Sequence, residues 1–136
     1  MKNIAFVLGS FHKEQVTQML ESGKHTAKNQ NLNIVDEVWV PGSMEKPIII
    51  KHLLKKKEID GVVILGIIER GETKHGFIMG DSVIKACIDL QLEFEKPIGV
   101  GIIGPEVFPS QIEPRIASYA QKAVMALSQM FKLLDD

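Results

Sequence analysis

The sequence predicts an α/β fold in which helices cover both faces of a parallel sheet. Three observations support this prediction: short runs rich in β-branched residues, helical spacing of apolar residues between and after these runs, and a 45% hydrophobic composition over 136 residues. Strands that alternate with helices form βαβ units, whose right-handed crossovers place helices on both faces of the sheet. We expect one domain over residues 1–136, since a separately folding unit usually has about 100 residues.

The expected elements follow one another regularly along the chain. Residues 3–8, 33–40, 61–68 and 97–103 are the β-branched or apolar runs and are predicted as strands. Helical spacing connects Val83, Cys87, Leu90 and Phe94 after the third run. It also connects Ile112, Ile116, Ala120, Ala123, Leu127, Met130 and Leu134 after the fourth. Because Cys87 falls within an apolar stripe, we expect it in the core.

Composition excludes several classes of function. The net charge of −1 argues against a nucleic-acid-binding surface. No apolar stretch approaches the roughly 18 residues that span a bilayer, so we expect no membrane insertion. The single cysteine cannot form an internal disulfide, and the first residues lack the pattern of a signal peptide, so we expect a cytoplasmic protein. The sequence has no phosphate-loop, dinucleotide-binding or zinc-binding motif.

Polar residues concentrate in the segments that follow the predicted strands. These segments are 9–12, 41–45, 69–75 and 104–106. Ligands of open parallel sheets bind outside the carboxyl ends of the strands. We therefore expect the functional site at this edge.

Residues 70–75 (RGETKH) are the most informative of these segments, because they follow an apolar strand and open a helix. Gly71 allows close approach of the backbone, Thr73 offers a hydroxyl, and the helix N-terminus favours an anion such as phosphate. The carboxylate of Glu72 must then point away from the anion. Alternatively, Thr73 is an ordinary N-cap.

His75 lies just inside the predicted helix, where an imidazole can give and take protons near neutral pH. The alternative is a structural or merely exposed histidine. His12 lies on the first loop and could touch a substrate, whereas His25 and His52 lie in predicted helices away from the ligand edge.

Three further side chains suit a ligand, each with a structural alternative. Phe11 could stack on a flat heterocycle or fold back onto the sheet. Glu45 precedes Pro47 at a helix start and could accept hydrogen bonds from a polyol or simply cap the helix. Arg115 precedes or opens the last helix and could bind phosphate or form a surface ion pair.

Two segments together carry a resemblance to a known family. Residues 40–47 (VPGSMEKP) and 65–75 (LGIIERGETKH) resemble the two signature segments of lumazine synthases, and their separation also fits. The resemblance extends from the first strand to the last helix. Residues 101–105 (GIIGP) and the helix after them look most like the archaeal branch.

The resemblance implies a four-stranded parallel sheet in a flavodoxin-like three-layer α/β/α sandwich. It implies pentamers, sometimes twelve of them in a hollow icosahedral shell, with active sites between neighbouring subunits. The implied activity condenses 5-amino-6-(D-ribitylamino)uracil with 3,4-dihydroxy-2-butanone 4-phosphate and releases phosphate and water, in riboflavin biosynthesis. No metal or organic cofactor is implied, and the partners are small-molecule substrates and further copies of the chain.

Matching positions imply roles for individual residues. His75 is the implied acid/base catalyst. The implied ligands of the ribitylamino-uracil are Phe11, which stacks on its ring, and Ser43, Met44, Glu45, Ile67, Ile68, Glu69 and Val100. The implied phosphate ligands are Gly71, Glu72 and Thr73, with Arg115 reaching in from the adjacent subunit and Lys122 as a second cation.

Five positions depart from the family pattern. His12 stands where the family commonly has Asn, Lys46 where it has an apolar residue, and Gly76 where it has a bulkier one. Met44 and Val100 replace frequent aromatic residues, which implies a looser pocket for the heterocycle.

Other functions compete with this interpretation. An archaeal-type riboflavin synthase acts on lumazine itself, and the Gly-Glu-Thr-x-His segment argues against it. A catalytically silent flavin- or lumazine-binding shell protein is less consistent with the presence of both His75 and Arg115. A flavodoxin-like signalling module requires an acidic phosphoacceptor cluster at the strand ends, which the sequence lacks.

Overall fold

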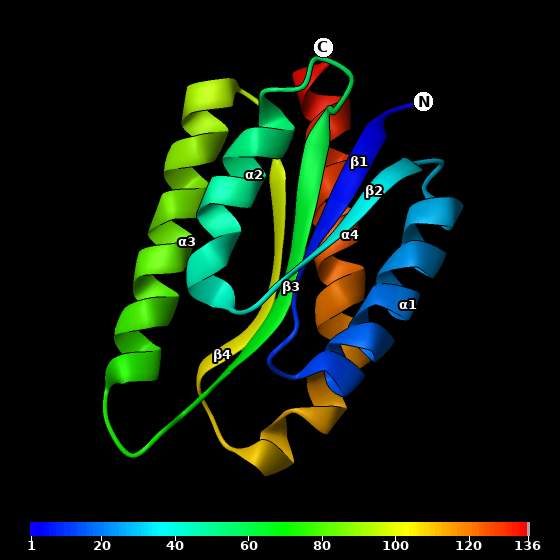
Figure 1. Ribbon diagram of the computed structural model, residues 1–136. Coiled ribbons are helices and arrows are strands. Elements are labelled where there is room, and N and C mark those ends of the chain that lie inside the picture. The colour runs from blue at the N-terminus through cyan, green and yellow to red at the C-terminus, as the bar shows by residue number, and fades with distance from the viewer. Residues whose placement is uncertain (136) are drawn as a thin grey trace.

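Four parallel strands form one sheet in the order β2-β1-β3-β4. They are β1 (Asn3–Gly9), β2 (Asn33–Val40), β3 (Gly61–Glu69) and β4 (Ile98–Val107). The computed structural model describes residues 1–135. Helices α1 (Lys13–Asn29) and α4 (Ile116–Leu134) cover one face, and α2 (Lys46–Leu54) and α3 (His75–Phe94) cover the other (Figure 1). The predicted three-layer α/β fold is thus confirmed.

The core has two apolar layers that meet at the sheet. In β1, Phe6 and Leu8 face α1 and α4, whereas Val7 faces α2 and α3. β3 is buried from its first residue to Ile68. A strand buried on both faces is typical of a parallel sheet. The predicted core position of Cys87 is confirmed, because its side chain is fully buried on the inner face of α3.

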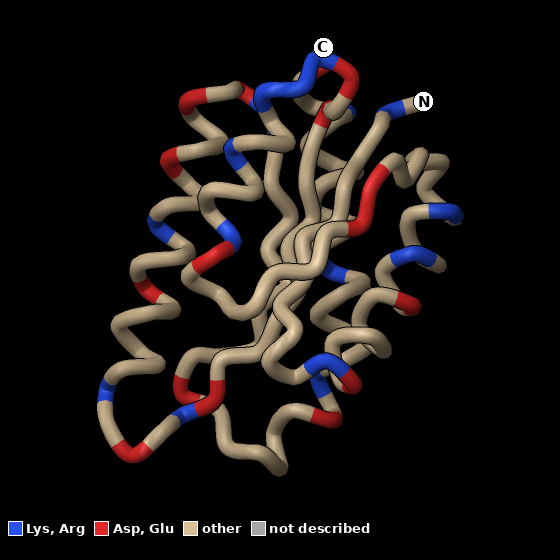
Figure 2. Tube along the Cα trace, in the orientation of Figure 1, with Lys and Arg blue, Asp and Glu red and all other residues tan. Residues whose placement is uncertain are grey.

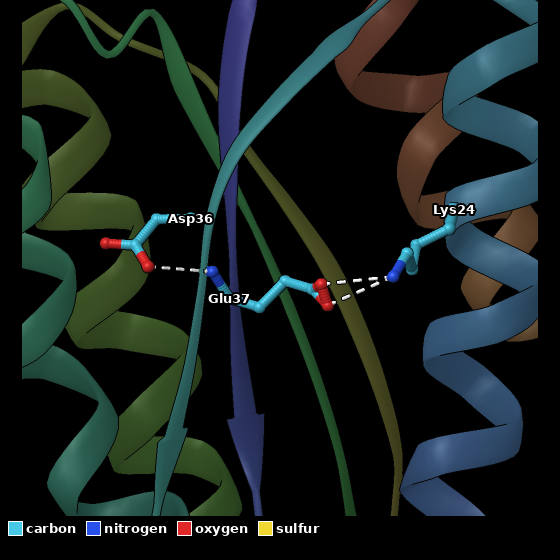
Figure 3. Close-up of polar contacts among 3 residues, drawn as sticks. All are labelled: Lys24, Asp36 and Glu37. Atoms are coloured by element: carbon cyan, nitrogen blue, oxygen red, sulfur yellow. Dashed lines mark hydrogen bonds and ion pairs between the residues drawn. The ribbon is translucent and has the colours of Figure 1, made fainter.

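An extra residue interrupts the edge strand β2. Ile4 pairs with Ile34 and Ala5 with Asp36, which leaves Val35 outside the register. A bulge of this kind exchanges the faces of all residues that follow it. Figure 3 shows the result: the Asp36 carboxylate accepts a hydrogen bond from the backbone N–H of Glu37 at 2.9 Å, while the Glu37 side chain reaches Lys24 of α1 at 3.1 Å.

The predicted strand 97–103 was wrong at its carboxyl end, because β4 continues to Val107. After a register shift, Glu69 pairs with Val107, and the backbone N–H of Arg70 donates to the Val107 carbonyl at 2.8 Å. The segment 104–106 is therefore part of the strand and not a loop. Two 3₁₀ turns, η2 (Pro109–Gln111) and η3 (Glu113–Arg115), connect β4 to α4.

Charged residues lie mainly on the helices and on the loops at the ends of the strands, while the central strands carry few of them (Figure 2). Among residues 1–135, no helix has the length and apolar character needed to cross a membrane.

The close packing of α4 on β4 gives a prediction for stability. A Cβ atom at Gly99 collides with the carbonyl oxygen of Ala123 in α4, whereas a Cβ atom at Gly71 meets nothing within 4 Å. Gly99→Ala is expected to lower the free energy of unfolding by about 1–3 kcal/mol, because α4 has to move off the sheet. Gly71→Ala is the matched control and is expected to change stability little. Urea denaturation measures both, and equal stability of the two variants contradicts the packing described here.

Candidate active site at the carboxyl edge of the sheet

A cavity of about 570 Å³ opens at the carboxyl ends of β1 and β3. Its size falls within the usual range for small-molecule sites, about 300–1,000 Å³. Three loops form its walls: residues 11–12 after β1, residues 42–45 after β2, and residues 67–76, which end β3 and begin α3.

The topology of the sheet creates this cavity. The chain leaves β1 towards α1 on one face, and it leaves the neighbouring strand β3 towards α3 on the opposite face (Figure 1). Loops that diverge in this way leave a crevice at the edge of the sheet. The cavity therefore lies at the edge of the sheet where the sequence predicts a site.

Most of the residues expected in the site line this one cavity. The structure brings together His75, Gly71 and Thr73 with Phe11, Ser43, Met44, Glu45, Ile67, Ile68 and Glu69. Glu72, Val100, Arg115 and Lys122 do not line it.

The ring of Phe11 is available to a ligand. Its side chain is 82% exposed, so it does not fold back onto the sheet. It meets the ring of His12 edge to face, with the ring centroids 5.0 Å apart. His12 also lines the cavity, and its Nε2 lies 3.7 Å from Oε1 of Glu69, a second lining residue. An exposed aromatic face beside polar groups suits a flat heterocycle with hydrogen-bonding edges.

The loop between β3 and α3 presents polar groups to the cavity. Helix α3 begins at His75 with Lys74 at the N-cap, and no side chain caps it. Thr73 is therefore not the N-cap; instead its hydroxyl accepts a hydrogen bond from the backbone N–H of His75 at 3.3 Å. The His75 side chain is exposed at the mouth of the cavity. The first N–H groups of a helix have no partner within the helix, so this loop can hold an anion.

Gly76 explains one departure from the family pattern. A Cβ atom at this position lies 2.8 Å from the carbonyl oxygen of Glu69. A bulkier residue therefore pushes the first turn of α3 away from the end of β3. In this chain the glycine allows the first turn of α3 to lie close to the end of β3.

The loop after β2 contributes a buried hydroxyl and an exposed carboxylate. Ser43 is 6% exposed, and Glu45 is exposed at the N-cap position of α2 without forming a side-chain cap. Lys46 follows, fully buried, and its Nζ donates a hydrogen bond to Ser43 Oγ at 3.3 Å. Burial lowers the pKa of Lys46 to about 8 and raises the pKa of the nearby Cys87 to about 11.

Three residues of the predicted site lie elsewhere on the chain. Val100 is 40% exposed on the edge strand β4. The Nη1 of Arg115 donates to the Gln111 carbonyl at 2.8 Å, and within residues 1–135 Arg115 forms no ion pair. Lys122 is exposed on α4, two helical turns beyond Arg115. Arg115 itself ends η3 and is the N-cap residue of α4, so both cations belong to the segment that begins this helix.

The sequence analysis missed two side chains that line the cavity. Met79 lies one helical turn after His75, so helical spacing was the signal that could have identified it. Arg70 was noted as part of its loop but was given no role. Its guanidinium lies over the ring of Phe108, 5.3 Å from the centroid, and its Nε is 3.4 Å from Glu106.

The residues that the structure describes contain no group of three or more His, Cys, Asp and Glu side chains that could hold a metal ion. The polar atoms of the cavity are hydroxyl, carboxylate, imidazole, guanidinium and backbone groups. Such an inventory suits the binding of a polar organic ligand and the transfer of protons.

Comparison with known proteins places the chain in one family. A sequence model of the family described as 6,7-dimethyl-8-ribityllumazine synthase matches residues 1–135. The chain is 39% identical over its whole length to the 6,7-dimethyl-8-ribityllumazine synthase of Methanococcus vannielii, of which it covers 96%. It is 38% identical over 134 residues to the enzyme of that name from Picrophilus torridus, with 98% of each chain covered.

A third relative, the 6,7-dimethyl-8-ribityllumazine synthase of Sulfolobus acidocaldarius, is 36% identical over 132 residues, which is 97% of this chain and 84% of that one. These relatives are archaeal, so the predicted resemblance to the archaeal branch is confirmed. Both the whole-length match and the identities show that the chain belongs to the 6,7-dimethyl-8-ribityllumazine synthase family.

Proposed function

We propose that this chain condenses 5-amino-6-(D-ribitylamino)uracil with 3,4-dihydroxy-2-butanone 4-phosphate to form 6,7-dimethyl-8-ribityllumazine, with release of phosphate and water. The observation that carries the proposal is the convergence of the loops after β1, β2 and β3 on one cavity with His75 at its mouth. Family membership supports the same reaction.

His75 is the proposed proton-transfer residue. Imine formation, loss of phosphate and ring closure each require protons to move, and a positioned imidazole can both donate and accept them. Two features support this role: the side chain is exposed to the cavity, and its backbone is tied to Thr73 by a hydrogen bond. The reaction needs no strong nucleophile from the protein, because the correct orientation of the two substrates supplies much of the rate acceleration.

The ribitylamino-uracil is proposed to lie between the loops after β1 and β3. Its ring stacks on Phe11, and its edge meets the end of β3 at Ile67, Ile68 and Glu69. Ser43 and Glu45 hold the hydroxyls of the ribityl chain, beside Met44. The cavity contacts described above support this placement.

The phosphate of the second substrate is proposed to lie at Gly71, Glu72 and Thr73. Arg115 and Lys122 complete this subsite from an adjacent subunit, and Val100 of that subunit closes the ring site. Two facts favour a shared site: none of these three side chains lines the cavity of its own chain, and Val100 is exposed on an edge strand. We therefore propose a homopentamer, either free or in a pentamer-based shell.

The alternatives are less well supported. The family match and the names of the relatives favour synthesis of lumazine over its conversion by a riboflavin synthase. A binding protein without catalytic activity does not require His75, and an assay for product formation distinguishes it from an enzyme.

His75→Ala is expected to lower kcat by roughly 10²-fold or more, the usual contribution of a general acid–base group. Formation of 6,7-dimethyl-8-ribityllumazine is followed by absorbance and fluorescence, with a no-enzyme baseline because the substrates condense slowly unaided. His52→Ala, on the exposed side of α2, is the control and is expected to keep full activity. Wild-type rates equal to the baseline contradict the proposed reaction, and unchanged rates in His75→Ala contradict the role of His75 alone.

Arg115→Ala is expected to raise KM for the sugar phosphate by about 10- to 100-fold, because charge-assisted hydrogen bonds to the phosphate are lost. KM for the pyrimidine is expected to change much less. Steady-state kinetics with each substrate varied in turn measure both values. Unchanged kinetics for both substrates remove Arg115 from the site.

A mixture of the two variants tests whether the site is shared. At a sugar-phosphate concentration well below the wild-type KM, where each variant alone is nearly inactive, His75→Ala and Arg115→Ala chains that are unfolded together and refolded as mixed oligomers are expected to regain up to about one quarter of wild-type activity. That fraction of the interfaces pairs an intact His75 with an intact Arg115 of the neighbour. The same chains refolded separately and mixed afterwards serve as the control. No gain in the mixed oligomers indicates that both residues act from one chain.

A further inference from the structure

Lys46 is a buried cation directly beneath the candidate site. It is the first residue of α2, and its side chain has no exposed surface. Its Nζ donates a hydrogen bond to Ser43 Oγ, 3.3 Å away, and Ser43 lines the cavity. The titratable groups that face the ammonium are Glu45, on the turn before α2, and Cys87, on α3. Lys46 thus contacts the site without lining it.

The sheet leaves space for the head of this side chain. A Cβ atom at Gly9, the last residue of β1, lies 3.0 Å from Lys46 Nζ, and a Cβ atom at Gly66 of β3 lies only 2.5 Å from it. Any side chain at Gly66 therefore displaces the ammonium. Because both neighbouring strands present glycine here, the lysine head occupies the gap between the carboxyl ends of β1 and β3 and Ser43.

The position of Lys46 is unfavourable for stability. A buried ammonium with one hydrogen bond loses most of its hydration. A cation at the first position of a helix is also repelled by the positive end of the helix dipole. An apolar side chain of similar length fills the same volume without either cost. A locally unfavourable choice of this kind is expected where it serves a functional site.

The hydrogen bond dictates how Ser43 can act. An ammonium has three donors and no acceptor, so Ser43 Oγ has to accept from Lys46. Among the described residues, the Ser43 hydroxyl donates to no other group. Its hydrogen is therefore free to point to the cavity. We propose that Lys46 is a positioning residue that holds Ser43 as a hydrogen-bond donor, and so favours a ligand with an acceptor oxygen at this point.

The inference rests on the proposed function in one respect: if the chain binds ribitylamino-uracil, the acceptor for the Ser43 hydroxyl is an oxygen of that ligand. Burial lowers the pKa of Lys46 to about 8 from the usual 10.5. Above pH 8 the neutral amine gains a lone pair and can accept from Ser43, which removes the donor from the cavity. Ligand affinity is thus expected to be highest below pH 8 and to fall as the pH rises through it.

The test compares wild type with Lys46→Met, with 6,7-dimethyl-8-ribityllumazine as a fluorescent binding probe between pH 6.5 and 9.5. Wild type is expected to bind several-fold more weakly above pH 8. Lys46→Met is expected to bind about fivefold more weakly than wild type at pH 7, the loss of one hydrogen bond, and to show no inflection near pH 8. In turnover assays the variant is expected to raise KM for the pyrimidine more than it lowers kcat.

Two further variants sharpen the comparison. Ser43→Ala is expected to weaken binding to a similar extent and to abolish the inflection. The double variant is then expected to be no weaker than Ser43→Ala alone, because both changes remove one interaction. Lys51→Met on the same helix is the control, since Lys51 is exposed and pairs with Glu93 at 3.5 Å; it is expected to behave as wild type.

The outcomes separate this inference from the proposed function. Identical pH profiles for wild type and Lys46→Met overturn the role of Lys46, even if the wild type makes lumazine. Loss of the inflection in Lys46→Met supports the role of Lys46, even if the wild type shows no turnover. A wild type that does not bind the probe overturns the inference.

Stability gives a readout that needs no ligand. The pKa of Lys46 is lowered on folding, so the unfolded chain binds more protons than the folded chain between pH 8 and 10.5. The contribution of Lys46 to the free energy of unfolding of the wild type therefore becomes more favourable as the pH rises through this range. Cys87 acts in the opposite direction, from pH 9.0 upwards. Lys46→Met is expected to have a higher urea midpoint than wild type at pH 7, with a smaller difference at pH 9. The same difference in urea midpoint at both pH values contradicts the presence of a buried, charged Lys46 at pH 7.

Discussion

The candidate site depends on the strand order β2-β1-β3-β4, and that order depends on β3. β3 is apolar on both faces and is buried along nearly its whole length. Such a strand needs a neighbour on each side and a helix layer on each face. With β1 beside it and α1 and α3 on opposite faces, the loops after β1 and β3 diverge at the carboxyl edge. The cavity is therefore a consequence of burying one apolar strand.

The same physical reasoning explains why much of the fold was predictable. The strand predicted over residues 33–40 is found at Asn33–Val40, and those predicted over 3–8 and 61–68 end one residue early. In a small α/β protein, short apolar runs of this length are buried mainly as strands of the central sheet. The carboxyl ends of parallel strands lie at one edge of the sheet, so the loops that follow them are close together. The common location of Phe11, Ser43 and His75 at one cavity could therefore be predicted from the strand order alone, before any side-chain packing was known.

Features that depend on contacts between distant segments could not be predicted. The residues around the bulge at Val35 of β2 do not predict it, since Val is favoured in regular strands. With the bulge, the side chains of Ile34 and Trp39 both face the apolar core between the sheet and α1. The extension of β4 to Val107 depends on backbone pairing with the end of β3. Arg115 could be placed near a helix start, but no pattern within one chain relates it to a cavity formed by other loops.

Lys46 shows why composition and spacing give an incomplete account of a site. At the start of a helix, a lysine is ordinarily an exposed side chain, and the sequence marks this one only as a departure from an apolar residue. Its direction depends on Gly9 and Gly66, which lie 37 and 20 residues away along the chain and leave space for its head between the strands. Placing an ammonium there costs stability, yet it also decides which way the Ser43 hydroxyl can point. A fold of this kind can therefore adjust recognition through a residue that no ligand touches, because the hydrogen-bonding direction of a lining hydroxyl is set by its buried partner.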